Sequence, residues 1–398
     1  MTTRAVEVTA SDQFAGRLEQ GGPARYSFAY RSDDPACQVS LTMPLRTASY
    51  EYPQLHPVFA QNLPEGYLRD IISRTVSKLH GASELALLAS LGPYQIGRLG
   101  YRHAGETTRT PTSPEKLDTL LGSDNPDLFA ELVDKYALRS GISGVQPKLL
   151  MDVMADPPRH KAAIRSGGLI VKSWGDDFPD LALNEYFCLR LARRAGLPVP
   201  RFEVSRDGRL FVMERFDVCA SGHYAGFEDG CVLQGLSPAE KYDSTYERLA
   251  RSVRDFVSPT RCQSALAGLF RSVVVSWAVQ NGDAHLKNFG VLYDAPGATV
   301  DLAPTYDIVT TTAYLRHDVP ALHLAGSKRW WPPDTLLAFG TTHCGLKPAQ
   351  ARSVLSEVAA ALQAELPHLE AAAPRFPDVA AAMREAWQDS LTALHRAL

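Results

Sequence analysis

The sequence predicts an α+β fold in two halves, with a mixed α/β N-terminal half and an all-α C-terminal half. Two observations predict it. Apolar, β-branched runs that are typical of buried strands occur at Lys148–Val153 and Gly168–Lys172. After Phe227, apolar residues recur at helical spacing in two long stripes, at 354–366 and 376–394. The stripes indicate a helical core rather than a cofactor site.

The first hundred residues predict one strand and two helices. Apolar residues alternate with polar ones over 39–45, which favours a half-buried strand. Pro64 opens a helix with apolar residues at helical spacing, and a second helix covers Ser83–Leu91 before Gly92 ends it. The Thr-, Pro- and Gly-rich stretch His103–Pro114 predicts a linker. We therefore place an N-terminal α/β subdomain at residues 1–110.

A second α/β unit is predicted at residues 111–217, built around one helix at 181–195. Leu183, Phe187 and Leu191 form one face of that helix, and Gly196 ends it. The remaining residues, 218–398, form the predicted helical unit.

The overall charge excludes several classes of function. The chain has 398 residues, with 41 basic and 44 acidic side chains. A net charge of −3 gives no global basic field, so we expect DNA contact only through a partner and no membrane association. No run approaches the roughly 20 apolar residues that span a bilayer. The six scattered cysteines show no CxxC pair, which favours free thiols in a cytoplasmic protein.

The most informative segment is Asn281–Asn288, with the sequence NGDAHLKN. Enzymes that transfer phosphoryl groups use an Asp to orient the acceptor hydroxyl and an Asn on the same turn to bind magnesium. Asp283 and Asn288 have that spacing, between an apolar helix and a short strand at 289–293. A solvated turn is the alternative, because Gly, Asp and Asn also favour turns.

A Gly-rich segment, 140–148, precedes the first strand of the second unit. Its glycines allow close approach to phosphates, and its hydroxyl and amide groups can hold their oxygens. An ordinary hairpin turn would use the same residue types. The candidate nucleotide contacts here are Ser143, Gly144, Val145, Gln146 and Lys148.

Further nucleotide contacts are predicted in the second unit, at Lys172 with Glu185 and at Glu214 and Phe216. Lys172 ends a buried strand, where ATP phosphates and Glu185 would offset its desolvation. A lysine that extends to solvent is the alternative. Glu214 and Phe216 follow the last strand, where a hinge would offer main-chain groups to adenine, although a plain linker fits the same residues.

Asp307, after the strand that follows the catalytic segment, completes the set. Together with Asn288 it would offer Mg²⁺ the carboxylate and amide oxygens that this cation prefers. Alone, Asp307 is as well explained as a helix cap. The order of the five elements along the chain favours a two-lobed, protein-kinase-like fold that uses ATP and Mg²⁺.

These motifs resemble those of HipA-type serine/threonine protein kinases, the toxins of type II toxin–antitoxin systems. The segment 62–66 also resembles the N-terminal subdomain of that family, so the resemblance covers nearly the whole chain. The matching segments are Gly141–Lys148, Asn184–Tyr186, Glu214–Asp217, Gly282–Phe289 and Tyr306–Ile308.

The resemblance implies roles for individual residues. Asp283 would be the catalytic base, Asn288 and Asp307 the magnesium ligands, and Lys172 the contact to ATP. His285 and Lys287 would stabilise the transferred phosphoryl group with positive charge. Known members phosphorylate aminoacyl-tRNA synthetases on serine, which stalls translation and growth. A small helix-turn-helix antitoxin of HipB type neutralises them and binds the operon DNA.

Members of the family also phosphorylate their own Gly-rich loop. Gly141 stands here at a position where the modified serine is often found. We therefore expect any self-modification at Ser143 first and at Ser140 second.

Two rival functions fit part of the pattern. A small-molecule kinase of the aminoglycoside or choline phosphotransferase type has a similar catalytic loop, but commonly has an acidic pocket that the C-terminal helices here do not predict. A catalytically inactive scaffold that binds only the antitoxin is the other, and the intact Asp283, Asn288, Asp307 and Lys172 disfavour it.

Overall fold

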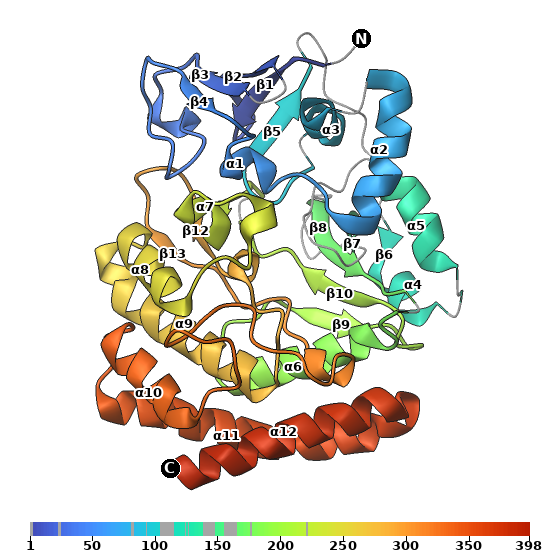
Figure 1. Ribbon diagram of the computed structural model, residues 1–398. Coiled ribbons are helices and arrows are strands. Elements are labelled where there is room, and N and C mark those ends of the chain that lie inside the picture. Colours follow the sequence, from blue (N-terminus) through green and yellow to red (C-terminus); the bar gives the residue numbers. More distant parts are fainter. Residues whose placement is uncertain are drawn as a thin grey trace.

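The computed structural model describes residues 3–22, 25–80, 83–92, 94–103, 115–123, 125, 127–137, 148–154, 165–175, 177–219 and 222–398. Figure 1 shows the N-terminal part (blue) at one end, a strand-rich middle (green), and the last helices (red) at the opposite end. The described ranges contain no helix that is both long and apolar enough to cross a bilayer.

An antiparallel sheet of five strands forms the N-terminal part, in the order β4-β3-β2-β1-β5. Period-two burial specifies it, as in β1, where Val6, Val8 and Ala10 point into the core. The strands are β1 (Ala5–Ala10), β2 (Gln13–Gly22), β3 (Arg25–Tyr30), β4 (Tyr50–Tyr52) and β5 (Leu99–Arg102).

The strand predicted at 39–45 is wrong. Ser40 and Met43 form one isolated bridge around a turn. Ser40 Oγ and Leu41 N donate hydrogen bonds of 2.9 and 2.8 Å to the buried Glu228 carboxylate, so this backbone contacts another part of the chain instead of a sheet. The alternation of apolar residues indicated which side chains are buried, but it did not indicate whether the backbone pairs with another strand.

Three helices pack beside this sheet: α1 (Pro57–Ala60), α2 (Gly66–His80) and α3 (Glu84–Leu91). The prediction of α3 is confirmed, including its ends. The Ser83 side chain accepts a hydrogen bond from Ala86 N, and Gly92 ends the helix at φ 60°, where glycine is favoured. Most of the predicted linker, at 104–114, lies outside the described residues.

The middle part is a second sheet, in the order β6-β7-β8-β10-β9. In β10, Phe211 and Met213 belong to the C-terminal core, whereas Val212 belongs to the N-terminal core. One strand therefore joins two cores. The elements are β6 (Glu115–Lys116), α4 (Leu117–Gly122), α5 (Leu128–Tyr136), β7 (Lys148–Met154), β8 (Arg165–Lys172), α6 (Leu181–Arg194), β9 (Phe202–Val204) and β10 (Phe211–Glu214).

The C-terminal part is mainly helical, as predicted, and also carries a small antiparallel sheet. Its helices are α7 (Gly230–Gln234), α8 (Tyr246–Phe256), α9 (Pro259–Ala278), α10 (Pro333–Thr342), α11 (Pro348–Ala372) and α12 (Pro377–Ala397). Its strands are β11 (Gly226–Asp229), β12 (Gly290–Tyr293), which was predicted, and β13 (Val300–Leu302). The core between the helices includes the fully buried Trp387 and Phe270.

Candidate active site

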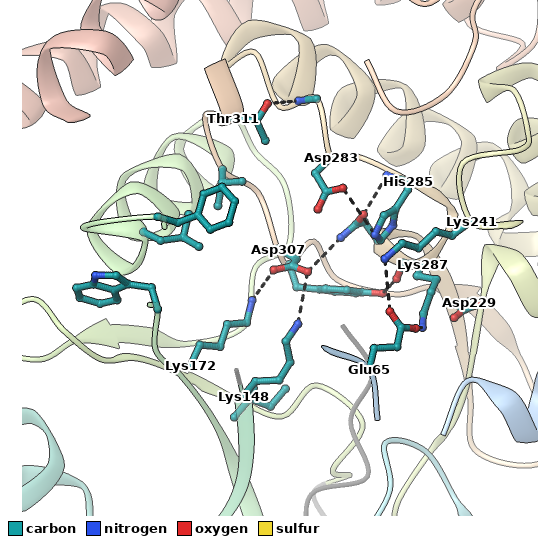
Figure 2. A pocket seen from close by; sticks show the side chains of 18 of the residues that line it. Glu65, Lys148, Lys172, Asp229, Lys241, Asp283, His285, Lys287, Asp307 and Thr311 are labelled. Atoms are coloured by element: carbon teal, nitrogen blue, oxygen red, sulfur yellow. Dashed lines mark hydrogen bonds and ion pairs between the residues drawn. The ribbon is translucent and has the colours of Figure 1, made fainter. Parts of the chain in front are cut away.

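A cavity of about 800 Å³ collects polar side chains from all three parts of the chain (Figure 2). Polar and charged residues on its lining include Glu65, Lys148, Lys172, Asp229, Lys241, Tyr242, Asp283, His285, Lys287, Asn288 and Asp307.

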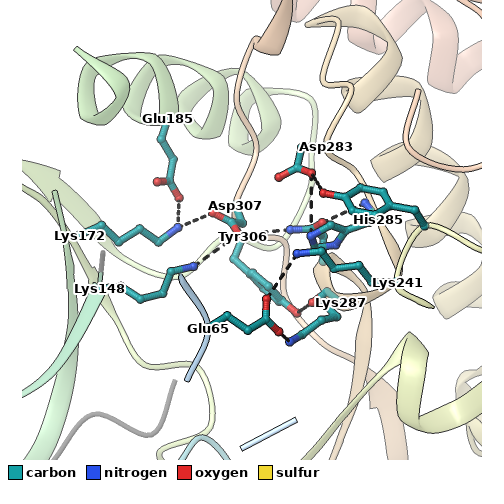
Figure 3. A network of polar contacts seen from close by, with 12 residues as sticks. Glu65, Lys148, Lys172, Glu185, Lys241, Asp283, His285, Lys287, Tyr306 and Asp307 are labelled. Carbon is teal, nitrogen blue, oxygen red and sulfur yellow. Dashed lines mark hydrogen bonds and ion pairs between the residues drawn. The ribbon is translucent and has the colours of Figure 1, made fainter. Parts of the chain in front are cut away.

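Two lysines on neighbouring strands reach one carboxylate. The antiparallel register of β7 and β8 places Lys148 opposite Lys172. Lys172 Nζ lies 2.6 Å from Glu185 Oε1 and 2.6 Å from Asp307 Oδ1, and Lys148 Nζ lies 3.8 Å from Asp307 Oδ2 (Figure 3). Lys172 is 3% exposed, so it does not extend to solvent. The strand pairing thus gives the cavity two adjacent cations.

Asp307 is held as an anion between these cations. Burial alone would raise its pKa, but the ammonium groups of Lys148 and Lys172 outweigh that effect and hold the pKa well below its ordinary value. Its backbone lies in the left-handed region, at φ 58°, which Asp tolerates better than most residues. Asp307 is therefore a fixed anion in the cavity.

The predicted catalytic segment, Asn281–Asn288, follows α9 and turns back before β12. Gly282 N donates to Thr311 Oγ1 at 2.7 Å, and a Cβ on Gly282 would lie 2.0 Å from Asp318 Oδ2. Only glycine fits this close approach. His285 N donates to Asn288 Oδ1 at 3.0 Å, which closes the turn Leu286–Asn288. The fold thereby brings Asp283 and Asn288 to the same cavity.

Asp283 lies in the cavity with 53% of its side chain exposed. Its Oδ1 accepts a hydrogen bond of 2.6 Å from the hydroxyl of Tyr242. Partial desolvation in the cavity raises the pKa of Asp283, and the hydrogen bond from Tyr242 opposes that effect. A raised pKa makes the ionised carboxylate a better proton acceptor, which is what a general base requires.

Burial disfavours the positive charge that was predicted for His285. The ring is buried, and burial lowers the pKa of His285 to about 3, so the imidazole is neutral at neutral pH. Lys287 forms an ion pair with Glu65. Lys241 Nζ lies 3.4 Å from the same carboxylate. The cations at this end of the cavity are thus two lysines that share one glutamate.

Asn288 and Asp307 offer a donor set that fits magnesium. Asn288 Nδ2 donates to Asp307 Oδ2 at 3.2 Å, so the two side chains are adjacent. A carboxylate and an amide beside a polar cavity are ligands that Mg²⁺ accepts. The amide oxygen of Asn288 accepts from His285 N, and the two oxygens of Asp307 face Lys172 and Asn288.

Of the two predicted hinge residues, only Phe216 lies on the cavity. Its ring stacks on Tyr306, with centroids 5.0 Å apart and planes 16° apart. Glu214 is exposed, and its N–H donates to Arg201 O at 2.8 Å. The apolar wall at the hinge is therefore formed by aromatic faces.

Hydrogen bonds connect the predicted hinge, Glu214–Asp217, to the N-terminal part. Arg215 forms an ion pair of 2.6 Å with Asp217 and donates to Gln95 O at 2.6 Å. Asp217 Oδ2 accepts from Gly97 N at 2.6 Å. These groups are buried, so the segment 95–97 is fixed to the hinge.

Ser140, Ser143, Gly144, Val145 and Gln146 all lie outside the described residues. Lys148, at the start of β7, is described and lies on the cavity.

Four residues on the cavity were not predicted from the sequence: Glu65, Lys241, Tyr242 and Asp229. Glu65 is 176 residues from Lys241 and 222 residues from Lys287. Single charged residues in loops carry no periodic signal, and only the tertiary fold brings them together.

Comparison with known proteins identifies the family. The HipA-like C-terminal domain matches residues 140–366, more than half of the chain, and the HipA N-terminal domain matches residues 6–102. Y4mE of Sinorhizobium fredii is 28% identical over 334 residues, covering 79% of each chain. The serine/threonine-protein kinase toxin HipA of Shewanella oneidensis is 24% identical over 341 residues, covering 78% of this chain and 76% of that one.

A solved structure agrees with the fold. The complex of Shewanella oneidensis HipA, HipB and operator DNA matches with a TM-score of 0.73 at 20% identity, over 98% of this chain and 97% of that one. The two matched domains lie within residues 6–102 and 140–366, and the solved structure matches over 98% of the chain. The chain therefore belongs to the HipA family and has its two-lobed, kinase-like fold.

Proposed function

We propose that this chain is an ATP- and Mg²⁺-dependent serine/threonine protein kinase. One observation carries the proposal. Four side chains lie on the same cavity, although Lys172 and Asp307 are 135 residues apart in the sequence: Lys172, Asp283, Asn288 and Asp307. A base, a phosphate-binding cation and a metal-binding pair are the parts that phosphoryl transfer requires.

Each group has a distinct task in the proposed reaction. Asp283 accepts the proton of the acceptor hydroxyl, and its raised pKa favours that transfer. Lys172, oriented by Glu185, binds phosphate oxygens. Asp307 and Asn288 would hold Mg²⁺, which would neutralise charge on the phosphates. The aromatic faces of Phe216 and Tyr306 suit a purine ring.

The Gly-rich segment would cover the phosphates and carry the self-modification. We place it at Ser143, with Ser140 as the second site. A phosphate there adds about −1.5 to −2 charges, which would repel ATP from the cavity. Mass spectrometry after incubation with Mg-ATP tests this, and the absence of phosphate on both serines would contradict it.

The family relationship supports the choice of partners. We propose a helix-turn-helix antitoxin of HipB type, because the matched solved structure is a complex of HipA with HipB and operator DNA. Contact with DNA would pass through that antitoxin, in line with the net charge of −3. As substrate we propose a protein such as an aminoacyl-tRNA synthetase, whose phosphorylation on serine would stop translation and growth.

The direct test is transfer of label from γ-labelled ATP to proteins of a bacterial lysate. We expect a labelled protein band with the wild-type chain and none with Asp283→Asn. Asp389→Asn, an exposed carboxylate on α12, is the matched control and should label as the wild type does. Label found only in small molecules would favour the small-molecule kinase instead. Growth arrest that persists in Asp283→Ala would favour the scaffold.

A further inference from the structure

Tyr242 places its hydroxyl on the proposed catalytic base. The residue lies between the turn Pro238–Glu240 and α8, on the wall of the cavity. Its hydroxyl donates to Asp283 Oδ1 at 2.6 Å. Other contacts hold the residue in place, because its ring packs edge-on against His285 at 5.2 Å and its carbonyl accepts from Lys328 at 3.2 Å.

This geometry is the one that a phosphoryl acceptor needs. An acceptor hydroxyl must lie about 2.6 to 3.2 Å from the general base that takes its proton. Tyr242 meets that distance, and no other side-chain hydroxyl in the described part of the chain donates to Asp283. Burial and the charge of Asp283 raise the pKa of Tyr242, so the hydroxyl stays protonated as a donor. With 38% of its surface exposed, the residue lies where an incoming molecule can reach it.

We infer that the Tyr242 hydroxyl occupies the acceptor position on Asp283 and that an acceptor hydroxyl must displace it. The inference rests on the proposed kinase function and adds a specificity-determining residue to the same site. While Tyr242 donates to Asp283, it competes with water for this oxygen of the base, so hydrolysis of ATP without an acceptor is slowed. A protein acceptor that binds the cavity wall supplies the contacts that displace the hydroxyl.

The test measures ATP hydrolysis without a protein acceptor. In that reaction a water oxygen bonds to the γ-phosphorus, the bond to the bridging oxygen of ADP breaks, and the water proton passes to Asp283. Tyr242→Phe keeps the ring but removes the competing hydroxyl. We expect the rate of hydrolysis to rise about tenfold, because water no longer competes with a hydrogen bond to the charged Asp283. Hydrolysis should vanish in the double variant Tyr242→Phe, Asp283→Asn.

Tyr50→Phe is the matched control. Tyr50 lies in β4, and its hydroxyl donates a hydrogen bond of the same length, 2.6 Å, to Pro44 O. This variant should hydrolyse ATP at the wild-type rate. Melting temperature and binding of a fluorescent ATP analogue establish that each variant is folded, and Tyr242→Leu provides a second removal of the hydroxyl.

The outcomes separate this inference from the proposed function. If both Tyr242 variants bind nucleotide but hydrolyse it no faster than the wild type, Tyr242 is not a competitor. Phosphate found on Tyr242 after incubation with Mg-ATP would also overturn the inference, because Tyr242 would then be an acceptor. If the wild type labels lysate proteins in an Asp283-dependent way, the kinase function stands whichever result Tyr242 gives. If it labels none, the kinase function fails.

Discussion

Glu65 of the N-terminal subdomain forms an ion pair with Lys287 of the catalytic segment, across 222 residues of sequence. Lys241 shares the same carboxylate, and the side chains of Lys241 and Lys287 are only 10% and 8% exposed. One carboxylate from the N-terminal subdomain therefore offsets two nearly buried cations beside the proposed catalytic base.

Replacement of this carboxylate should destabilise the protein. Glu65→Gln leaves two cations without their shared partner, so we expect the free energy of unfolding to fall by about 2 kcal/mol and Tm by several degrees. Because phosphate oxygens can replace the carboxylate, Mg-ATP should raise the Tm of Glu65→Gln more than that of the wild type. Thermal melts with and without Mg-ATP measure both effects.

Glu51→Gln is the control for that experiment. Glu51 pairs with Arg25 on the surface, with side chains 52% and 66% exposed, so its removal should leave Tm nearly unchanged. Equal melting temperatures for Glu65→Gln and the wild type would show that the pair contributes nothing.

Asp307→Asn should remove the effect of magnesium on nucleotide binding. The carboxylate is the anion between Lys148 and Lys172 and the charged member of the proposed magnesium ligands. We expect the wild type to bind ATP more tightly with Mg²⁺ than without it, and the variant to show no difference. Transfer activity should fall by a factor of about 10² or more. Titration calorimetry with and without Mg²⁺ measures the first effect, and a magnesium response retained by the variant would contradict the assignment.

The activity should fall as the pH decreases because Asp283 becomes protonated. Its raised pKa means that this loss begins at a higher pH than for an ordinary Asp, near 3.9. His285, with a pKa of about 3, should add no inflection near 6.5. A profile of kcat/KM against pH measures both, and an inflection near 6.5 that disappears in His285→Gln would disprove the neutral imidazole.

His56 should make stability depend on pH. Burial lowers its pKa from 6.5 to about 4, so between these values the unfolded chain binds a proton that the folded chain does not. Stability is therefore highest above pH 6.5 and falls toward pH 4, by on the order of 3 kcal/mol from this residue. His56→Asn, which can still accept from Val58 N, should flatten the dependence. Urea unfolding at pH 7 and pH 4.5 measures the free energy of unfolding of both proteins. If the wild type and His56→Asn lose the same free energy between these pH values, His56 is not the cause.

The sequence predicted those parts of the fold whose signals are local. The helix α3 was predicted because Ser83 and Gly92 mark its ends, and α6 because its apolar residues share one face. The strand at 39–45 was wrong because alternation reports burial and not the hydrogen-bond partner, which here is Glu228.

The candidate site divides in the same way. Asp283 and Asn288 stand at a fixed spacing, so the sequence could indicate them. Glu65 and Tyr242 acquire their positions only through tertiary contacts. The charge of His285 could not be predicted from the sequence either, because burial of the ring in the folded chain lowers its pKa.

Segment 95–97 is hydrogen-bonded to Arg215 and Asp217 of the predicted hinge, and these contacts restrict how the hinge can move. Opening and closing of a two-lobed enzyme requires rotation at its hinge, and here that rotation must carry part of the N-terminal subdomain with it. A change in the angle between the lobes would therefore be coupled to a movement of this subdomain. A protein that binds only the outer surface of the N-terminal sheet could set the width of the cleft from a distance.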